Sequence, residues 1–597
     1  MHLEGKIKEQ ISEGFKALFE AELKVEEIKL QPTRKEFKGH FTFVTFPFSR
    51  ISKKSPEETG KALGEWMYSK NSIISDYNIV KGFLNLEITD QTWLKVFKHI
   101  LSQKHYGFTE QTGEEVMVEY SSPNTNKPLH LGHLRNIFLG YSVAKILEAN
   151  GCKVHRVQII NDRGIHICKS MLAWQKFGNG ETPESSGIKG DHLVGKYYVL
   201  FEKHYRQQVG ELIEKGQPKE EAERNAPLII EAQEMLRKWE QKDKEVYHLW
   251  ETMNQWVYQG FDATYQKMGV DFDKLYYESD TFLYGKEKVL VGLEKDIFFK
   301  KPDGSSWVDL SSEGLDQKIL IRSDGTSVYV TQDIGTAIFR FEDFPNISRL
   351  IYTVGNEQEY HFKVLFLILK KLGYKWADGL YHLAYGMVDL PSGKMKSREG
   401  TVVDADDIID EMISTAERKT RELGKIEGFT EEQAKELYHV LGLGAIKYFL
   451  LKVDPLKRML FNPEQSIELH GNTGPFIQYT HARISAIIRT AKEKGITIDG
   501  FDINNDIELN QYEREVLYQI NDFANKIKEA ANEISPSVIA KYAYDLAKEY
   551  NKFYAEISIF NEPDKDRLRF RVMFSYLVAR TIKDAMGLLG IEVPIRM

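Results

Sequence analysis

Two histidines three positions apart, His130 and His133, occur where the sequence predicts that a strand gives way to a helix. The apolar run 116–118 is typical of a buried strand, and apolar residues recur at helical spacing over 134–149. Such a junction presents backbone N–H groups and the positive end of a helix dipole. Gly132 has no side chain, so a flat ring can pack on the backbone beside it. The imidazoles can donate to phosphate oxygens, and the segment predicts a site for a nucleotide.

The histidine pair also has plainer interpretations, because two histidines at this spacing often face a core or bind a metal. The segment that precedes them favours the nucleotide. In it, Pro128 forces an extended entry into the loop.

A second segment far downstream, 393–400, is a basic loop bounded by glycines. The predicted strand 383–388 precedes it, and Asp404 can cap a helix that continues through Ile408, Ile409 and Met412. A lysine cluster alone is usually a solvated loop. Paired with the histidines, this loop can close over a triphosphate and neutralise charge as pyrophosphate leaves.

The two segments resemble the signature motifs of the class I aminoacyl-tRNA synthetases. His130-Leu131-Gly132-His133 is similar to the family's His-Ile-Gly-His, and Lys394-Met395-Lys396-Ser397 to Lys-Met-Ser-Lys. Lys396 stands where the family has Ser, and Ser397 where it has the second Lys. The arginine-specific branch typically shows Lys-Met-Ser-Thr-Arg or similar, which Ser397-Arg398 fits better. In that branch a lysine before the first motif supplies the missing charge, and Lys127 occupies that place.

This resemblance implies ATP-dependent attachment of L-arginine to the 3′ end of tRNA(Arg) through an arginyl-adenylate, with AMP and diphosphate released. No protein nucleophile is needed, because the enzyme positions reactants and stabilises charge. It also implies Mg²⁺ with the phosphates, no zinc, and activation of arginine only with tRNA bound. The residues expected to stabilise charge are His130, His133, Lys127, Lys394 and Arg398. Those expected to bind ATP are His130, Gly132, His133, Lys394, Met395, Lys396 and Ser397.

Selecting arginine over lysine requires carboxylates that match a planar guanidinium, with a flat neighbour. Glu119 closes the strand before the first motif, and Asp324-Gly325 predicts a hairpin turn. Tyr329 and Asp333 are four residues apart and share a face if they are helical. Asp333 as a helix N-cap is an open alternative.

By the resemblance, the arginine pocket is lined by Glu119, Asn124, His133, Tyr329, Asp333 and Gln358, with His361 three residues beyond Gln358. One departure is Arg163, in the segment 161–164, where the branch usually has Trp in Gly-Asp-Trp-Gly.

The C-terminal part carries two further resemblances to this branch, in the segments 474–483 and 588–597. Aromatic and basic residues suit splayed RNA bases, although Tyr479 and Phe83 are equally compatible with a core. The residues that the resemblance assigns to tRNA are Phe83, Asn85, Gln478, Tyr479, Arg483, Arg596 and Met597.

The pattern predicts an α/β protein of three domains. Residues 1–110 form a small α+β domain, with Ile11, Phe15, Leu18 and Phe19 on one helix face and strands at 41–46 and 83–88. The resemblance implies that this domain contacts the tRNA D-loop. Residues 111–430 form a Rossmann-like parallel-sheet catalytic domain with a helical insertion at about 171–265, and strands at 347–354 and 383–388. Residues 431–597 form an all-α domain, which the resemblance implies binds the anticodon.

A chain of 597 residues with 42% hydrophobic and 28% charged residues fits an ordinary globular protein. Its longest apolar run, 440–451, is too short for a bilayer, and 1–8 lacks an apolar signal core. Only Cys152 and Cys168 occur, which excludes a four-cysteine zinc site and fits a reducing cytoplasm. We expect a cytoplasmic monomer. The net charge of -8 does not itself suggest RNA. Rivals are a small-molecule nucleotidyltransferase and a non-catalytic tRNA-binding paralogue.

Overall fold

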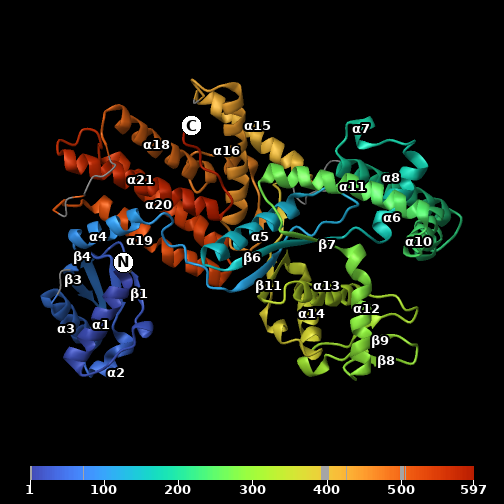
Figure 1. Cartoon of the computed structure of the whole chain (residues 1–597), viewed down its shortest axis with the longest axis horizontal. Coiled ribbons are helices and arrows are strands. Elements are labelled where there is room, and N and C mark those ends of the chain that lie inside the picture. The colour runs from blue at the N-terminus through green and yellow to red at the C-terminus, as the bar shows by residue number, and fades with distance from the viewer. Residues whose placement is uncertain (1–2, 71–72, 392–402, 425, 498–502, 504–505) are drawn as a thin grey trace.

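A five-stranded parallel sheet lies at the centre of the molecule (Figure 1). The computed structural model describes residues 3–70, 73–391, 403–424, 426–497, 503 and 506–597. Lys394, Met395, Lys396, Ser397 and Arg398 therefore lie outside the described residues. In the order of the sheet, the strands are β12 (Leu380–Tyr385), β11 (Ile347–Gly355), β5 (Glu115–Glu119), β6 (Lys153–Ile160) and β7 (Lys274–Tyr277).

The expected Rossmann-like sheet is confirmed, and the helices α5 (Leu131–Ala149), α13 (Tyr329–Asp343) and α14 (Glu359–Lys371) connect its strands. The strand predicted at 383–388 is instead interrupted at Gly386, whose N–H donates to the Pro455 carbonyl. Beyond it, β13 (Val388–Asp389) pairs in parallel with β14 (Met459–Leu460).

The N-terminal part is an antiparallel sheet in the order β1 (Leu30–Pro32), β2 (Phe41–Val44), β4 (Phe83–Ile88) and β3 (Ile74–Val80). The helices α1 (Leu3–Phe19) and α3 (Pro56–Lys70) pack beside it, and α4 (Asp90–Ser102) leads to the central sheet. The buried face of α1 contains Ile11 and Phe15, but Leu18 is 37% exposed. The prediction that Leu18 shares this buried face was wrong. The large buried side chains follow one another at i, i+4 spacing from Leu3, and Leu18 lies outside that row.

Helices fill the segment between β6 and β7, as expected for the insertion: α6 (Ile165–Phe177), α7 (Pro183–Ser186), α8 (Gly190–Glu214), α9 (Lys219–Asn225), α10 (Pro227–Glu240) and α11 (Lys244–Met268). They lie on the opposite side of the molecule from the N-terminal sheet (Figure 1). The sequence did not predict α12 (Glu278–Glu294) or the small antiparallel sheet of β8 (Phe299–Lys300), β9 (Ser306–Val308) and β10 (Lys318–Ile321).

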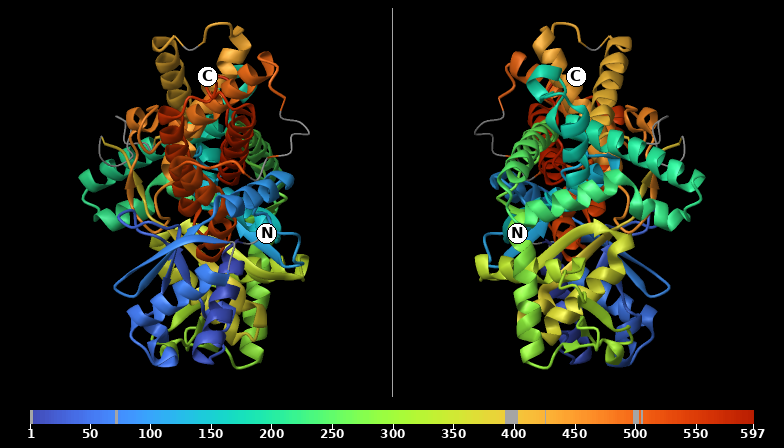
Figure 2. Two further views of the ribbon diagram at one scale, coloured as in Figure 1. Left: turned by 90° about the vertical axis from the view of Figure 1, so that its left-hand side faces the viewer. Right: turned by 90° about the vertical axis from the view of Figure 1, so that its right-hand side faces the viewer.

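The C-terminal part is helical: α15 (Ala405–Glu422), α16 (Glu431–Leu451), α17 (Pro463–Ser466), α18 (Gly474–Glu493), α19 (Gln511–Glu533), α20 (Pro536–Glu556) and α21 (Lys565–Leu588). Figure 2 shows these helices above the N-terminal sheet in both side views. None of the helices in the described part of the chain combines the length and hydropathy of a membrane span.

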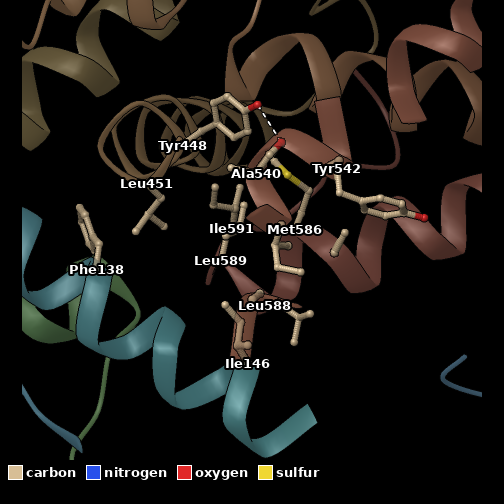
Figure 3. Packing of buried hydrophobic residues seen from close by; sticks show 14 of the residues in the cluster. Phe138, Ile146, Tyr448, Leu451, Ala540, Tyr542, Met586, Leu588, Leu589 and Ile591 are labelled. Atoms are coloured by element: carbon tan, nitrogen blue, oxygen red, sulfur yellow. Dashed lines mark hydrogen bonds between the residues drawn. The ribbon is translucent and has the colours of Figure 1, made fainter. Parts of the chain in front are cut away.

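Helix α5 is buried on nearly every side, because C-terminal helices cover the part of its surface that the sheet does not. Phe138 and Ile146 of α5 belong to one apolar cluster with Leu451 of α16 and Leu588 at the end of α21 (Figure 3). The helix that begins at the histidine motif is thus packed directly against the C-terminal helices.

Candidate functional site

His130 and His133 begin helix α5 and are oriented by the main chain. His130 is the N-cap, and its Nδ1 accepts a hydrogen bond from the Gly132 N–H at 3.1 Å. The Nδ1 of His133 accepts from the His130 N–H, also at 3.1 Å. A Cβ at position 132 would lie 3.0 Å from the Cε1 of His130, so glycine allows this ring to fold over the helix start.

Both imidazoles are neutral at physiological pH. Burial, with a smaller contribution from the Lys127 charge, lowers the pKa of His130 to about 4. Burial also lowers the pKa of His133 well below its ordinary value, and His130 and Lys127 add to this. Since each Nδ1 accepts a hydrogen bond, the proton of each neutral ring lies on Nε2. The pair therefore offers two Nε2–H donors, which suits phosphate oxygens. Burial likewise lowers the pKa of the Lys127 ammonium, which is half-buried in the same loop.

The chain reaches this motif through a strained turn that directly follows β5. Ser121 and Ser122 both have left-handed backbones, with φ of 73° and 47°. Such conformations cost roughly 1–3 kcal/mol each and persist only where the surroundings hold them. Asn136 on α5 provides that restraint, because its side chain accepts from the Ser121 N–H and donates to the Thr353 carbonyl of β11. Sequence analysis did not identify Asn136, whose partners are on other elements.

A cavity of about 450 Å³ opens at the carboxyl ends of β5 and β6. This edge of a parallel sheet is where such folds bind their ligands. Three of the residues predicted for arginine line it, namely Asn124, Tyr329 and Asp333. Tyr329 is 76% exposed, so its ring is available to a ligand. The lining also includes Arg163, Glu278, Arg322 and Gln332.

Asp333 lies within α13 rather than at its start, since Val328 is the N-cap of this helix. The helix-cap alternative is therefore wrong. The Asp333 carboxylate lies 2.6 Å from the Nε2 of His361, and this hydrogen bond raises the pKa of His361 although burial opposes it. Gln358 ends a short 3-10 turn before α14 and is exposed, outside the lining of this cavity.

Glu119 at the end of β5 is only 5% exposed and pairs with a buried arginine of α13, Arg340. Its other carboxylate oxygen accepts from Ser122 at 2.9 Å. The rings of Tyr276 and Tyr352 lie near the Arg340 guanidinium. Glu119 therefore already has a cationic partner within the protein and is not part of the cavity lining.

The segment that follows the basic loop lies against the histidine motif. The Leu131 N–H donates to the Val403 carbonyl at 3.3 Å, and the Ala405 N–H donates to Leu129 at 2.9 Å. Asp404 caps α15 as expected, with its side chain accepting from the N–H groups of residues 406 and 407. The two motifs are thus adjacent through their flanking residues, although the loop's own basic residues are not described.

A cluster of charged residues connects the start of α15 to the helical insertion between β6 and β7. The sequence analysis did not predict this cluster. The Lys189 ammonium lies 2.6 Å from Asp406 and 3.2 Å from Asp191, and it also donates to Thr264. His192 adds a contact of 3.3 Å to Asp406. Asp191, His192 and Asp406 have the spacing of metal ligands, but the ammonium already lies among their carboxylates. The cluster connects α8 and α11 to the start of α15.

The residues assigned to tRNA lie in two separate parts of the molecule, and two of them are buried. Asn85 on β4 is 1% exposed, and its amide is bonded to Thr42 and Asn78, whereas Phe83 is partly exposed. On α18, the buried Gln478 donates to the carbonyls of residues 440 and 592.

The remaining C-terminal residues are Tyr479 and Arg483 on α18 and Arg596 and Met597 at the end of the chain. Arg483 lies over the rings of Tyr479 and Tyr554, at 4.8 and 5.0 Å. Arg596 donates to the carbonyls of residues 427 and 428. Tyr479 and Met597 line a second cavity, of about 430 Å³.

Two protein-family models match this chain, and together they cover most of its length. The model of "tRNA synthetases class I (R), catalytic domain" matches residues 95–462, and that of the "DALR anticodon binding domain" matches residues 477–597. Arginine–tRNA ligases of Bacteroides thetaiotaomicron and Bacteroides fragilis are each 56% identical over 599 aligned positions that cover 100% of both chains. The chain belongs to the arginyl-tRNA synthetase family.

Solved structures of arginyl-tRNA synthetases share the fold. The Thermus thermophilus structure has a TM-score of 0.79 at 24% identity and covers 99% of each chain. The Plasmodium falciparum structure has a TM-score of 0.75 at 19% identity and covers 100% of this chain and 99% of its own. Because both identities are below 25%, these two structures show that the fold is shared and nothing more.

Proposed function

We propose that this chain is an arginine–tRNA ligase that joins L-arginine to the 3′ end of tRNA(Arg). The arginine carboxylate attacks the α-phosphate of ATP, diphosphate leaves, and a terminal hydroxyl of the tRNA then takes the arginyl group and releases AMP. The observation that carries this proposal is a cavity with a carboxylate and an exposed tyrosine at the same sheet edge as the histidine motif. The 56% identity to relatives named arginine–tRNA ligase supports it.

His130 and His133 would stabilise charge on the reacting phosphates through their Nε2–H donors. Lys127 would supply a nearby positive charge. Lys394 and Arg398, together with Met395, Lys396 and Ser397, would act from the loop that follows β13. Mg²⁺ would arrive with ATP, bound to its phosphates. Gly132 would leave room for the nucleotide beside the helix start.

For arginine, Asp333 and Tyr329 would hold the guanidinium in the cavity that Asn124 also lines. His133 is not part of this lining, and we propose that it reaches the arginine from the start of α5. We also keep Glu119 and Gln358 in the proposed pocket. Glu119 is paired with Arg340, and Gln358 lies outside the cavity lining. We therefore propose that both contribute less to arginine binding than Asp333 and Tyr329.

For tRNA, we propose that residues 1–110 contact the D-loop and 431–597 read the anticodon, on either side of a catalytic domain at 111–430. The partly exposed Phe83 would touch RNA, while the buried Asn85 would hold the strand that presents it. Tyr479, Arg483, Arg596 and Met597 would contact the anticodon stem-loop, and Gln478 would fix the C-terminal segment. We propose a cytoplasmic monomer, in which the buried Cys152 and Cys168 stay reduced.

A single assay tests this function. Purified protein is given ATP, Mg²⁺, L-arginine and tRNA(Arg), and AMP and arginyl-tRNA are measured. Both should accumulate only when all components are present, and lysine should not replace arginine. tRNA binding without AMP formation would instead support a non-catalytic tRNA-binding protein.

A further inference from the structure

Helix α4 lies between the N-terminal sheet and the C-terminal helices (Figure 1). Strand β4 ends at Ile88 and α4 begins at Asp90, so only the N-cap Thr89 separates the two elements. Because β4 carries Phe83, the place of α4 also sets the place of that ring. The contacts that hold α4 therefore determine how the N-terminal part is oriented on the rest of the chain.

The first turn of α4 is held by an arginine of the C-terminal part. The Arg514 guanidinium of α19 binds the Asp90 carboxylate through two hydrogen bonds, from Nε to Oδ1 at 2.6 Å and from Nη2 to Oδ2 at 3.0 Å. The Leu509 N–H also donates to this carboxylate, at 3.1 Å. A bidentate pair fixes direction as well as distance, because the guanidinium and the carboxylate are both planar.

The last turn of α4 is held by a second arginine of the C-terminal part. Arg580 of α21 donates to the carbonyls of Ile100 and Leu101, at 2.7 and 3.1 Å. These carbonyls lie at the negative end of the α4 dipole, where a cation is favourable. A buried pair between Arg571 of α21 and Glu513 of α19, at 2.9 Å, connects the two helices that carry these arginines. Both ends of α4 are therefore attached to one pair of connected helices.

Aromatic side chains fill the space between these two attachments. Trp93 of α4 is fully buried, and its ring centre lies 6.5 Å from that of Tyr518 on α19. The Tyr518 ring also lies 5.2 Å from that of Phe41 on β2. Further along α4, the ring centres of Phe97 and Phe570 of α21 are 5.3 Å apart. Domains move relative to one another unless their interface is large and apolar, and this interface has an apolar centre.

We propose that Asp90, Arg514 and Arg580 are positioning residues for tRNA, which fix the span between the N-terminal surface around Phe83 and the C-terminal surface for the anticodon. This inference rests on the proposed contacts of these two parts with tRNA(Arg). A tRNA that touches both surfaces binds more tightly than either contact alone allows, because the second contact forms within an existing complex. This gain requires that the two surfaces keep the spacing that the tRNA presents.

The test compares two RNAs bound to the full-length protein. A complete tRNA(Arg) transcript reaches both surfaces, whereas its isolated anticodon stem-loop reaches only the C-terminal one. The Kd of each RNA is measured by fluorescence anisotropy. Arg514→Met combined with Arg580→Met releases both ends of α4. It should weaken binding of the complete tRNA by about tenfold and change binding of the stem-loop by less than about twofold.

A second variant separates positioning from direct contact with RNA. Asp90→Asn loosens the same attachment as Arg514→Met, but it removes a negative charge instead of a positive one. Both single variants should weaken binding of the complete tRNA, by about threefold or more. If Arg514 contacted the RNA directly, Asp90→Asn would release it and strengthen binding, which would overturn the proposal.

Arg349→Met is the matched control. The Arg349 side chain is 34% exposed, close to the 28% of Arg514, and pairs with Glu114 in the catalytic domain. This variant should leave both Kd values unchanged. A loss of tRNA binding as large as that of Arg514→Met would show that removal of any such arginine suffices, and it would contradict the proposal.

The remaining outcomes are also decisive. Equal losses for both RNAs would mean that the arginines only maintain the C-terminal fold, and unchanged binding by the double variant would mean that α4 does not set the span. Either overturns the proposal. Phe83→Ala should weaken binding of the complete tRNA, and less so once both arginines are replaced. A silent Phe83→Ala would refute the inference while the protein still forms arginyl-tRNA. Failure of the proposed function differs, because the unmodified protein would then form no arginyl-tRNA.

Discussion

The imidazole rings of His130 and His133 lie with their centres 3.9 Å apart, and each accepts a main-chain N–H at Nδ1. This arrangement fixes both rings as neutral Nε2–H donors at the start of α5. His133→Ala should lower aminoacylation by about 100-fold or more, the usual effect of losing one preorganised donor to developing charge. The rate of arginyl-tRNA formation measures this. His248→Ala, an exposed histidine of α11, is the matched control. An unchanged rate in folded His133→Ala would refute the role.

Lys127 and Lys396 are the two candidates for the positive charge that the second loop lysine supplies in the family. We expect Lys127→Ala to be the more damaging change for pyrophosphate formation, because Pro128 restricts the backbone beside it. Burial lowers the pKa of Lys127, so its charge is lost at a lower pH than that of an ordinary lysine. Pyrophosphate formation should therefore decline early on the alkaline side.

Comparison of the two alanine variants decides between these lysines. A silent Lys127→Ala with an inactive Lys396→Ala would assign the role to the loop and refute our choice.

Lys189→Met should loosen the start of α15. The Lys189 ammonium donates a hydrogen bond to Asp406. Burial alone would raise the pKa of Asp406, but the hydrogen bonds from His192 and Lys189 lower that pKa well below its ordinary value. Hydrogen exchange of the amides at 405–409 should therefore speed up by about 10- to 150-fold, since bonds to charged groups contribute roughly 1.5–3 kcal/mol. Lys196→Met is the control, because Lys196 is 48% exposed and its pair with Glu181 should contribute little.

The pH dependence of this restraint has a definite sign. A carboxylate with a lowered pKa stabilises the folded state above its unfolded pKa, and this contribution is lost as the pH falls through the lowered value. In the unmodified protein, protection of the 405–409 amides from hydrogen exchange should therefore persist at pH 5. As the pH falls, Lys189→Met should lose this protection before pH 5 is reached. Equal exchange in both proteins would show that the cluster does not hold α15.

The elements that carry the two motifs could be predicted because their signals are local. Apolar runs mark β5 and β11, and Asp404 precedes α15 as its cap. The strand predicted at 383–388 failed at Gly386, where the chain leaves the sheet to meet Pro455. That partner is distant in sequence, so no local pattern announces the break.

The rest of the site depends on contacts between distant segments. Lys189 meets Asp406, 217 residues away, and Asn136 binds Thr353, again 217 residues away. The pairing of Glu119 with Arg340 likewise changed the expected pocket, because a buried cation already occupies one predicted carboxylate. Periodicity predicts that α13 has a buried face, but it does not predict which buried arginine meets which strand end.

Asp333→Asn tests the account most directly, because it keeps the shape of the side chain and removes the charge that should hold the guanidinium. Calorimetric binding of arginine, with tRNA present, should weaken by about 10- to 150-fold, as expected for a charged hydrogen bond whose carboxylate is partly exposed. ATP binding should be nearly unchanged, and Asp316→Asn, 92% exposed at its side chain, should bind arginine normally. Unaltered arginine binding by Asp333→Asn would contradict the account, since the cavity would then not be where arginine is recognised.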